Sequence, residues 1–459
     1  MLRQRARFRR RAADMRELSL VVLATAAVAC NYASRSLIPI LSPAVCDELR
    51  ICISAGLVSE STSAFFLGDL VAQFSAAWLV KRVSGPWLLA TTTIGWTLAT
   101  VLIPLALRSS FALPLHTFLQ LSRGLLCGFG YPSAHAIAAA SPSGATALGF
   151  INAAGGIGMM LANFLVPQLL RRHAWDTAFA VIGMVTLPMA VMLAVASARL
   201  GVRLLKLPEG CGCAPQESSW AALVHGIGSD YWLWMQQPLV RAVITWMVVT
   251  AVGVQTVGGA FLPSFFMDRH GVSLTDLGGY TGAPPLVQVG VCLSVGVACD
   301  MLVSRAGYSA TSVRWGAQLV ASAIPALCLL LLAPLESSPA TAAVLVTVWH
   351  GCTSFHSAGA MAVLHAVGRG RAGELFVLGN GFAKLGALLS TTVIRGLLDT
   401  LGWPPVLLCI AAAYAASGAM LLPRMANAKH IDRAAAFVAG ESTAASPDMD
   451  GDARRRKDE

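Results

Sequence analysis

The chain has 459 residues, of which 56% are hydrophobic and only 12% are charged, and its mean hydropathy is +0.66. A soluble domain carries roughly 25% charged residues, so this composition excludes a soluble enzyme and a disordered scaffold. The net charge of +10 is concentrated in the tails and short loops, which is typical of membrane topology and argues against a nucleic-acid partner.

Apolar stretches long enough to cross a lipid bilayer, which takes about 20 helical residues, recur along the whole chain. Six of them precede a polar central segment and six follow it. We predict membrane spans near 18–44, 56–80, 86–107, 112–139, 144–169, 177–199, 239–266, 276–302, 312–334, 339–366, 373–397 and 402–422. Because helices satisfy their own backbone groups inside lipid, the sequence predicts an all-α membrane protein of twelve transmembrane helices in two six-helix bundles.

The spans divide the chain into five regions. The two bundles occupy 18–199 and 239–422, and residues 200–238 form a predicted cytoplasmic linker. The basic segment 1–17 is a predicted cytoplasmic tail, and the polar segment 423–459 is predicted to be a disordered cytoplasmic tail. An Arg-rich start is also typical of a transit peptide, so the membrane, an organelle membrane included, is not fixed by the sequence.

The distribution of basic residues predicts the orientation. With both tails in the cytoplasm, the cytoplasmic segments hold 24 of the 33 Lys and Arg residues and the outer loops hold five. Arg171 and Arg172 are the pair of residues that depart from this rule. Cys46 and Cys52 flank the first outer loop, and whether they form a disulfide is not settled by their spacing.

Local sequences in several spans resemble those of one known family. They are NYASR, SAFFLGDLVAQFSAAWLVKR and RGLLCGFGYPSAH in the first, second and fourth spans, FLPSFF and GVACD at the ends of the seventh and eighth, and GNGFAKLG in the eleventh. The chain thereby resembles the major facilitator superfamily and, within it, the anion:cation symporters, which include sialin and the vesicular glutamate and plastid phosphate transporters. The resemblance implies secondary transport of a small organic or inorganic anion by alternating access.

The chain also departs from the pattern of that family. Ser34 stands where the family has an acidic residue, and Cys127 stands where it has a glutamate. The second span carries Asp69 in place of an aromatic residue, and the following loop has Lys81 and Arg82 in place of an Asp-Arg pair. The anion-binding part of the pattern is therefore present, whereas the usual proton-carrying carboxylates are missing.

Arg35 is the strongest candidate for a substrate-binding residue. A guanidinium in the middle of an apolar span costs about 2.5–3.5 kcal/mol on insertion scales, so it must face a cavity or a partner. Because arginine binds planar anions through two parallel hydrogen bonds, we predict that Arg35 binds the substrate. The alternative is a structural ion pair with an acid such as Asp69. Tyr32 lies one helical turn away and shares its face.

Further candidates lie on the second, fourth and eleventh spans. Arg123 is a predicted second anion ligand, or else an interfacial residue whose head group reaches water. Lys384 is a predicted third positive group, and the resemblance implies that Asn380 contacts the substrate. Asp69 and His135 are candidates for a proton or cation relay, with a fixed ion pair and a structural histidine as the respective alternatives.

The ends of two spans provide candidate gate residues. The resemblance places Asp300, Lys81 and Arg82 beside the two short loops that follow the second and eighth spans. The coupling ion is H⁺ or Na⁺, and exchange without coupling is a third interpretation. No catalytic, metal-binding or cofactor-binding motif occurs in a plausible context, so we expect no enzyme activity and no cofactor. A membrane receptor or scaffold without transport activity is the alternative function.

Overall fold

The structure of the protein is a computed structural model that describes residues 2–50, 54–139, 144–199, 202, 220–334, 338–368 and 371–439. The regular elements in these ranges are helices, which confirms the predicted all-α class. Cys52 lies outside the described residues, and so do about half of the linker and the last twenty residues of the chain. The structure therefore does not bear on a pairing of Cys46 with Cys52.

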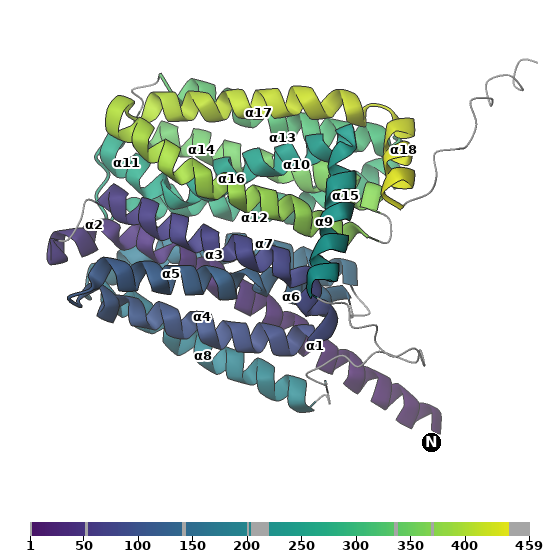
Figure 1. Ribbon diagram of the computed structural model, residues 1–459, viewed down its shortest axis with the longest axis horizontal. Helices are drawn as coiled ribbons and strands as arrows, with labels where there is room; N and C mark the ends of the chain where they lie inside the picture. The colour runs from purple at the N-terminus through teal and green to yellow at the C-terminus, as the bar shows by residue number, and fades with distance from the viewer. Residues whose placement is uncertain are drawn as a thin grey trace, which may run out of the picture.

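The helices of the amino-terminal half run side by side along the long axis of the molecule (Figure 1). They are α1 (Leu2–Arg35), α2 (Leu37–Leu49), α3 (Ser54–Arg82), α4 (Gly85–Leu107), α5 (Ala112–Gly128), α6 (Gly130–Ala139), α7 (Gly144–Leu170) and α8 (Asp176–Arg199). Each of the first six predicted spans corresponds to one of these helices or to two consecutive ones.

The helices of the carboxyl-terminal half form a second layer of parallel rods above the first in the same view. They are α10 (Pro238–Thr250), the π-helix η1 (Ala251–Ala260), α11 (Leu262–His270), α12 (Leu277–Ser304), α13 (Ala310–Leu332), α14 (Pro339–Thr353), the 3₁₀ turn η2 (Ser354–Ser357), α15 (Ala360–Gly368), α16 (Ala372–Leu401) and α17 (Trp403–Met425). The two halves meet where α3 packs on α16 and α7 packs on α12.

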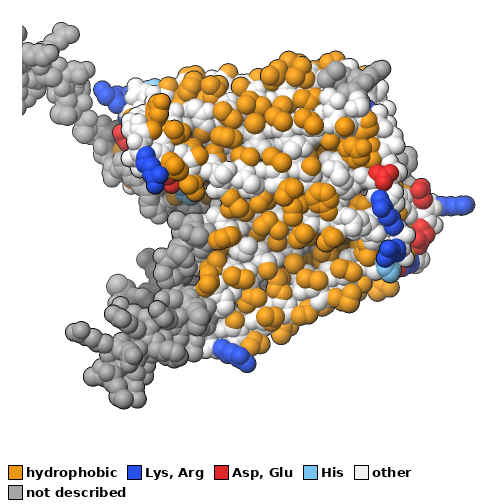
Figure 2. Space-filling model, turned by 180° about the vertical axis from the view of Figure 1, so that it is seen from behind, with side chains coloured by type: hydrophobic (Ala, Val, Ile, Leu, Met, Phe, Trp, Pro, Cys, Tyr) orange, Lys and Arg blue, Asp and Glu red, His pale blue; other side chains and the backbone are white. Residues whose placement is uncertain are grey.

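The molecule has two distinct ends. Helices α9 (Trp220–Gln236), α15 and α18 (Ala428–Ala439) lie at one end, which we call the linker end. Helices α2 and α11 lie at the other end, which we call the opposite end. Apolar side chains cover the surface between the ends, and charged side chains gather at the two rims (Figure 2).

This surface suits a lipid environment. Large apolar residues such as Leu105, Leu165 and Val297 are more than half exposed. Among the described residues, nine segments are long and apolar enough to cross a membrane. The remaining predicted spans correspond to α3 and to the interrupted pairs α5–α6 and α14–α15.

Prolines account for two interruptions. A proline removes the hydrogen bond to the carbonyl four residues earlier and its ring clashes with that carbonyl. Pro39 acts in this way on Arg35, where α1 ends, and Pro132 acts on Gly128, where α5 ends. Both breaks fall inside predicted spans, and both adjoin the polar site described below.

One prediction about the polar segments needs correction. The segment 423–459 was expected to be disordered, but residues Ala428–Ala439 form helix α18. Its buried residues Ile431, Ala434, Ala435 and Val438 follow the i, i+3, i+4, i+7 spacing of one helix face, which packs on α15 and α17. The low overall hydrophobicity of the tail concealed this periodic segment. The predicted linker includes helix α9.

Candidate substrate site

Arg35 ends α1 at the break that Pro39 causes. Its Nε atom donates a hydrogen bond to Oδ1 of Asn31 at 2.7 Å, one helical turn earlier. Its guanidinium carbon lies 4.5 Å from the ring centre of Tyr32 and 4.6 Å from that of Phe65. The side chain is 18% exposed, so its head group is held between two rings and is still accessible.

Asp69 on α3 lies beside Arg35, with 3.7 Å between its Oδ2 atom and Nη1 of the arginine. Gln73, one turn along α3, donates a hydrogen bond to Oδ1 of Asp69 at 3.0 Å. The same amide donates to the carbonyl of Gly128 at 3.2 Å, and this is the carbonyl that Pro132 leaves without its helical partner. The break in the fourth span thus fixes the orientation of the carboxylate.

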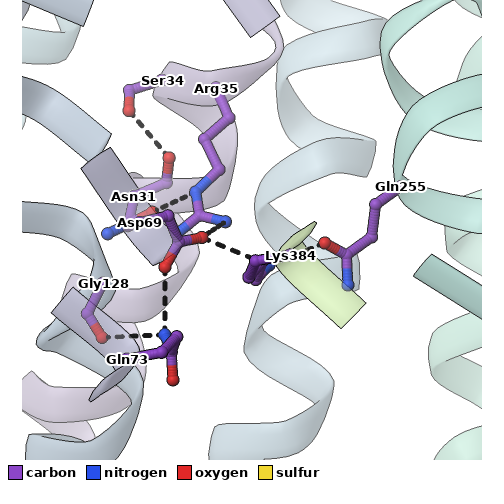
Figure 3. A network of polar contacts seen from close by, with 8 residues as sticks. All are labelled: Asn31, Ser34, Arg35, Asp69, Gln73, Gly128, Gln255 and Lys384. Atoms are coloured by element: carbon purple, nitrogen blue, oxygen red, sulfur yellow. Dashed lines mark hydrogen bonds and ion pairs between the residues drawn. The ribbon is translucent and has the colours of Figure 1, made fainter. Parts of the chain in front are cut away.

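Lys384 on α16 brings the carboxyl-terminal half into the same site (Figure 3). Its Nζ atom lies 3.2 Å from Oδ2 of Asp69 and donates a hydrogen bond to Oε1 of Gln255 at 2.7 Å. Gln255 belongs to the π-helix η1, an element that occurs often at functional sites. Both ends of the ion pair are nearly inaccessible, since Asp69 is 1% exposed and Lys384 is 4% exposed.

Arg123 is buried inside the amino-terminal half, where only 1% of its surface is exposed. It donates hydrogen bonds to Oε1 of Gln120 at 2.6 Å and to the carbonyl of Ser34 at 2.9 Å. The interpretation that its head group reaches water at the interface is therefore wrong. Its described hydrogen bonds go to neutral groups, so its positive charge adds to that of the nearby site.

Two cavities meet at Arg35. The larger one has a volume of about 400 Å³, lies between the halves and extends toward the linker end. The smaller one, of about 80 Å³, lies toward the opposite end. Tyr32, Arg35, Met159 and Gln255 line both cavities, so these residues form the boundary between them.

The predicted binding residues divide between these cavities. Most of them line the larger cavity together, although they come from both halves: Tyr32, Arg35, Asp69, His135, Asn380 and Lys384. Arg123 lines the smaller cavity instead. Of the predicted gate residues, Asp300 and Arg82 are exposed at helix ends and line neither described cavity. The Lys81 side chain lies outside the described part of the chain.

Several site residues were missed by the sequence reasoning. Gln73, Asn31 and Gln255 hold the charged groups in place, and none of them carries a charge that makes it conspicuous in an apolar span. Asn31 and Gln73 lie four residues from Arg35 and Asp69, a spacing that places side chains on one helix face. That spacing was a usable signal, whereas the contact of Gln255 depends on the packing of the two halves.

The sequence was compared with protein families and with known proteins. The sequence profile of the Major Facilitator Superfamily matches residues 24–391. The chain belongs to the Major Facilitator Superfamily. A search of curated protein sequences finds no match.

Solved structures of this superfamily fold resemble the protein at low sequence identity. A crystal structure of a D-xylose-proton symporter matches with a TM-score of 0.66 and 12% identity over 89% of this chain and 97% of that chain. A bacterial homologue of the human lysosomal transporter Spinster, in an inward-facing and unoccupied conformation, matches with a TM-score of 0.55 and 14% identity over 94% of this chain and 99% of that chain. These matches show that the chain has the fold of these two proteins.

Proposed function

We propose that this protein is a secondary transporter that moves a small organic or inorganic anion, with a carboxylate or phosphate group, by alternating access. One observation carries the proposal. Arg35 from the amino-terminal half and Lys384 from the carboxyl-terminal half line the same cavity, with Asp69 between them. The resemblance of the local sequences to the anion:cation symporters supports the same substrate class.

The balance of charge favours an anionic substrate. Two cations and one carboxylate leave one surplus positive charge in the described lining of the larger cavity, and Arg123 adds a second positive charge behind it. Buried charges are costly unless they are paired. An anion bound between Arg35 and Lys384 compensates the surplus and contacts both halves at once, so it favours states in which the halves enclose it.

Asp69 provides a means of ion coupling. A substrate anion that binds Arg35 and Lys384 competes with the Asp69 carboxylate for the same two cations. A buried carboxylate that loses its cations is strongly destabilised, so it must take up H⁺ or Na⁺. The other groups around it, Gln73 and the Cys127 thiol, do not supply a positive charge. We propose that anion and coupling ion therefore move together, as in symport.

Flux measurements test the anion proposal. Purified protein in proteoliposomes is assayed with radiolabelled lactate and inorganic phosphate, with protein-free liposomes as the background. We expect uptake of at least one anion, and we expect Arg35→Ala to lower it at least about 30-fold, because truncating one partner of a buried charge pair costs 2–5 kcal/mol. Arg172→Ala, at an exposed position outside both cavities, is the matched control.

Two outcomes would contradict the proposal. Equal flux in wild type and Arg35→Ala would remove Arg35 from the substrate site. Thermal stabilisation of the protein by an anion without any flux would instead favour the receptor or scaffold alternative.

The pH profile tests the coupling proposal. Asp69→Asn keeps the shape of the side chain but cannot take up a proton, so we expect it to flatten the dependence of anion uptake on external pH. Arg172→Ala keeps the whole site and serves as the comparison variant, with the pH profile of wild type expected. If wild-type uptake varies with Na⁺ and not with pH, the coupling ion is Na⁺, and an unchanged pH profile in Asp69→Asn would exclude Asp69 as the proton carrier.

A further inference from the structure

Four aromatic side chains form a continuous series along the larger cavity, and we call them the aromatic wall: Tyr32, Tyr131, His135 and Phe376. The series begins at Arg35, whose guanidinium lies over Tyr32. Ring centres are 6.4 Å apart between Tyr32 and Tyr131 and 4.9 Å apart between Tyr131 and His135. His135 stacks on Phe376 of the other half at 6.0 Å.

The polar edges of Tyr131 and His135 are fixed by one residue. Oδ1 of Asn152 accepts a hydrogen bond from the Tyr131 hydroxyl at 3.0 Å and lies 3.2 Å from Nε2 of His135. The Tyr32 ring lies against Gly155, where a Cβ atom would stand 3.3 Å from three of its carbons. Three of the rings are therefore held in place, and all four are only half-buried. Half-buried rings on a cavity wall are a stacking surface for a ligand.

The charges and the size of the cavity limit the ligand further. With Asp69 ionised and the lining histidines neutral, Arg35, Lys384 and Asp69 give the site a net charge of +1, which matches a monoanion until the coupling ion binds. A volume of about 400 Å³ lies in the range of roughly 300–1,000 Å³ that holds organic ligands in proteins. A small inorganic ion would leave most of the aromatic wall in contact with water.

From this geometry we infer that the substrate is an aromatic monocarboxylate. Its carboxylate binds Arg35 and Lys384, and its ring packs on Tyr131 and His135. The inference rests on the proposed function, because it specifies the body of an anion whose acidic group binds the same cations. Asn152 is a positioning residue in this arrangement, since it orients the two rings and has no direct role toward the carboxylate.

Binding measurements on the full chain in detergent test the inference. Isothermal titration compares benzoate with cyclohexanecarboxylate, acetate, phthalate and inorganic phosphate. Aromatic pairs contribute 0.5–1.5 kcal/mol beyond their buried area, and two or three such contacts predict that benzoate binds about 10-fold more tightly than cyclohexanecarboxylate. We expect the dianion phthalate to bind more weakly than benzoate.

Variants of the wall separate ring recognition from charge recognition. Tyr131→Leu and Phe376→Leu are expected to weaken benzoate binding about 3- to 10-fold and to leave acetate binding within about twofold. Tyr131→Phe keeps the ring and is the matched control, with benzoate affinity expected within about threefold of wild type. Thermal unfolding and size-exclusion chromatography confirm that each variant is folded.

The outcomes distinguish the inference from the proposed function. Equal affinity for benzoate and cyclohexanecarboxylate would contradict an aromatic substrate. Equal decreases in the affinities for benzoate and acetate in Tyr131→Leu and Phe376→Leu would contradict it as well. Neither result would contradict the proposal of anion transport. Preference for inorganic phosphate would have the same meaning. If none of the anions binds, or if Arg35→Ala binds them as wild type does, the proposed function itself fails.

Discussion

The same two halves form both ends of the molecule, yet the linker end is hollow and the opposite end is packed. The larger cavity extends from Arg35 toward the linker end, and only the cavity of about 80 Å³ lies beyond it. At the opposite end α12 approaches α7 closely: a Cβ atom on Gly282 would stand 2.7 Å from the Phe164 ring. Arg171 also reaches across the halves to Asp276 at 3.3 Å.

The difference between the two ends explains where the ion pairs of Arg35, Asp69 and Lys384 lie. Asp69 and Lys384 join the halves at the point where the hollow part ends and the packed part begins. A bound anion in this position changes the contact between the halves without disturbing either rim. The packed end consists of close apolar contacts, a hydroxyl contact between Ser63 and Thr391, and exposed ion pairs. It lacks a buried charge pair among the described contacts, so it can open at a small cost, as alternating access requires.

Breaking the network at the boundary is expected to have the largest effect. Asp69→Asn leaves Lys384 and Arg35 without their carboxylate, and removing one partner of a buried pair costs about 3–5 kcal/mol. We expect a clearly lower midpoint of thermal unfolding in detergent. The double variant Asp69→Asn/Lys384→Met removes the stranded charge, so its midpoint should lie closer to wild type than that of Asp69→Asn alone. If Lys384→Met instead lowers the unfolding midpoint further in the Asp69→Asn background, Asp69 and Lys384 do not stabilise the protein as a pair.

Opening the packed end by steric pressure is expected to have the next largest effect. Gly282→Leu places a side chain against Phe164, and overpacking costs about 1–3 kcal/mol, which corresponds to a population shift of roughly 5- to 150-fold. Thr62 lines the small cavity, so Thr62→Cys serves as the reporter. We expect a charged maleimide to label it at least about fivefold faster in the Gly282→Leu background.

Gly279 on the same helix is the matched control for this experiment. A Cβ atom added there meets no atom within 4 Å, so Gly279→Leu is expected to leave the labelling rate of Thr62→Cys unchanged. Equal acceleration by both leucine substitutions would mean that the seam between α7 and α12 does not close this end.

The sequence predicts the helices and the charged residues well, for a physical reason. Apolar stretches of bilayer length are unmistakable, and a charge such as Arg35, Asp69 or Lys384 within them is costly enough to imply a cavity or a partner. The sequence also raised an ion pair between Arg35 and Asp69 as an alternative, and the structure places the two side chains in contact. Arg35 is nevertheless 18% exposed and lines the cavity, so this arginine is both paired and accessible.

Other parts of the site could not be predicted from one chain. The contact of Lys384 with Asp69 joins the two halves, and no local spacing encodes it. The burial of Arg123 depends likewise on the carbonyl of Ser34 on another helix. The role of Pro132 lies between these cases, because a proline predicts a carbonyl without its helical partner, although it does not predict that Gln73 will occupy it.

The exposed ion pair at the packed end is expected to have the smallest effect. Arg171 and Asp276 are 55% and 63% exposed, and such pairs contribute about 0–1 kcal/mol and weaken with salt. We expect Arg171→Ala to accelerate labelling of Thr62→Cys at most about fivefold, and added NaCl to accelerate wild type more than this variant. Arg172→Ala, at the neighbouring exposed position, should behave as wild type. Acceleration by Arg171→Ala equal to that of Gly282→Leu would contradict this ranking, because it would mean that charge, and not apolar packing, closes the opposite end.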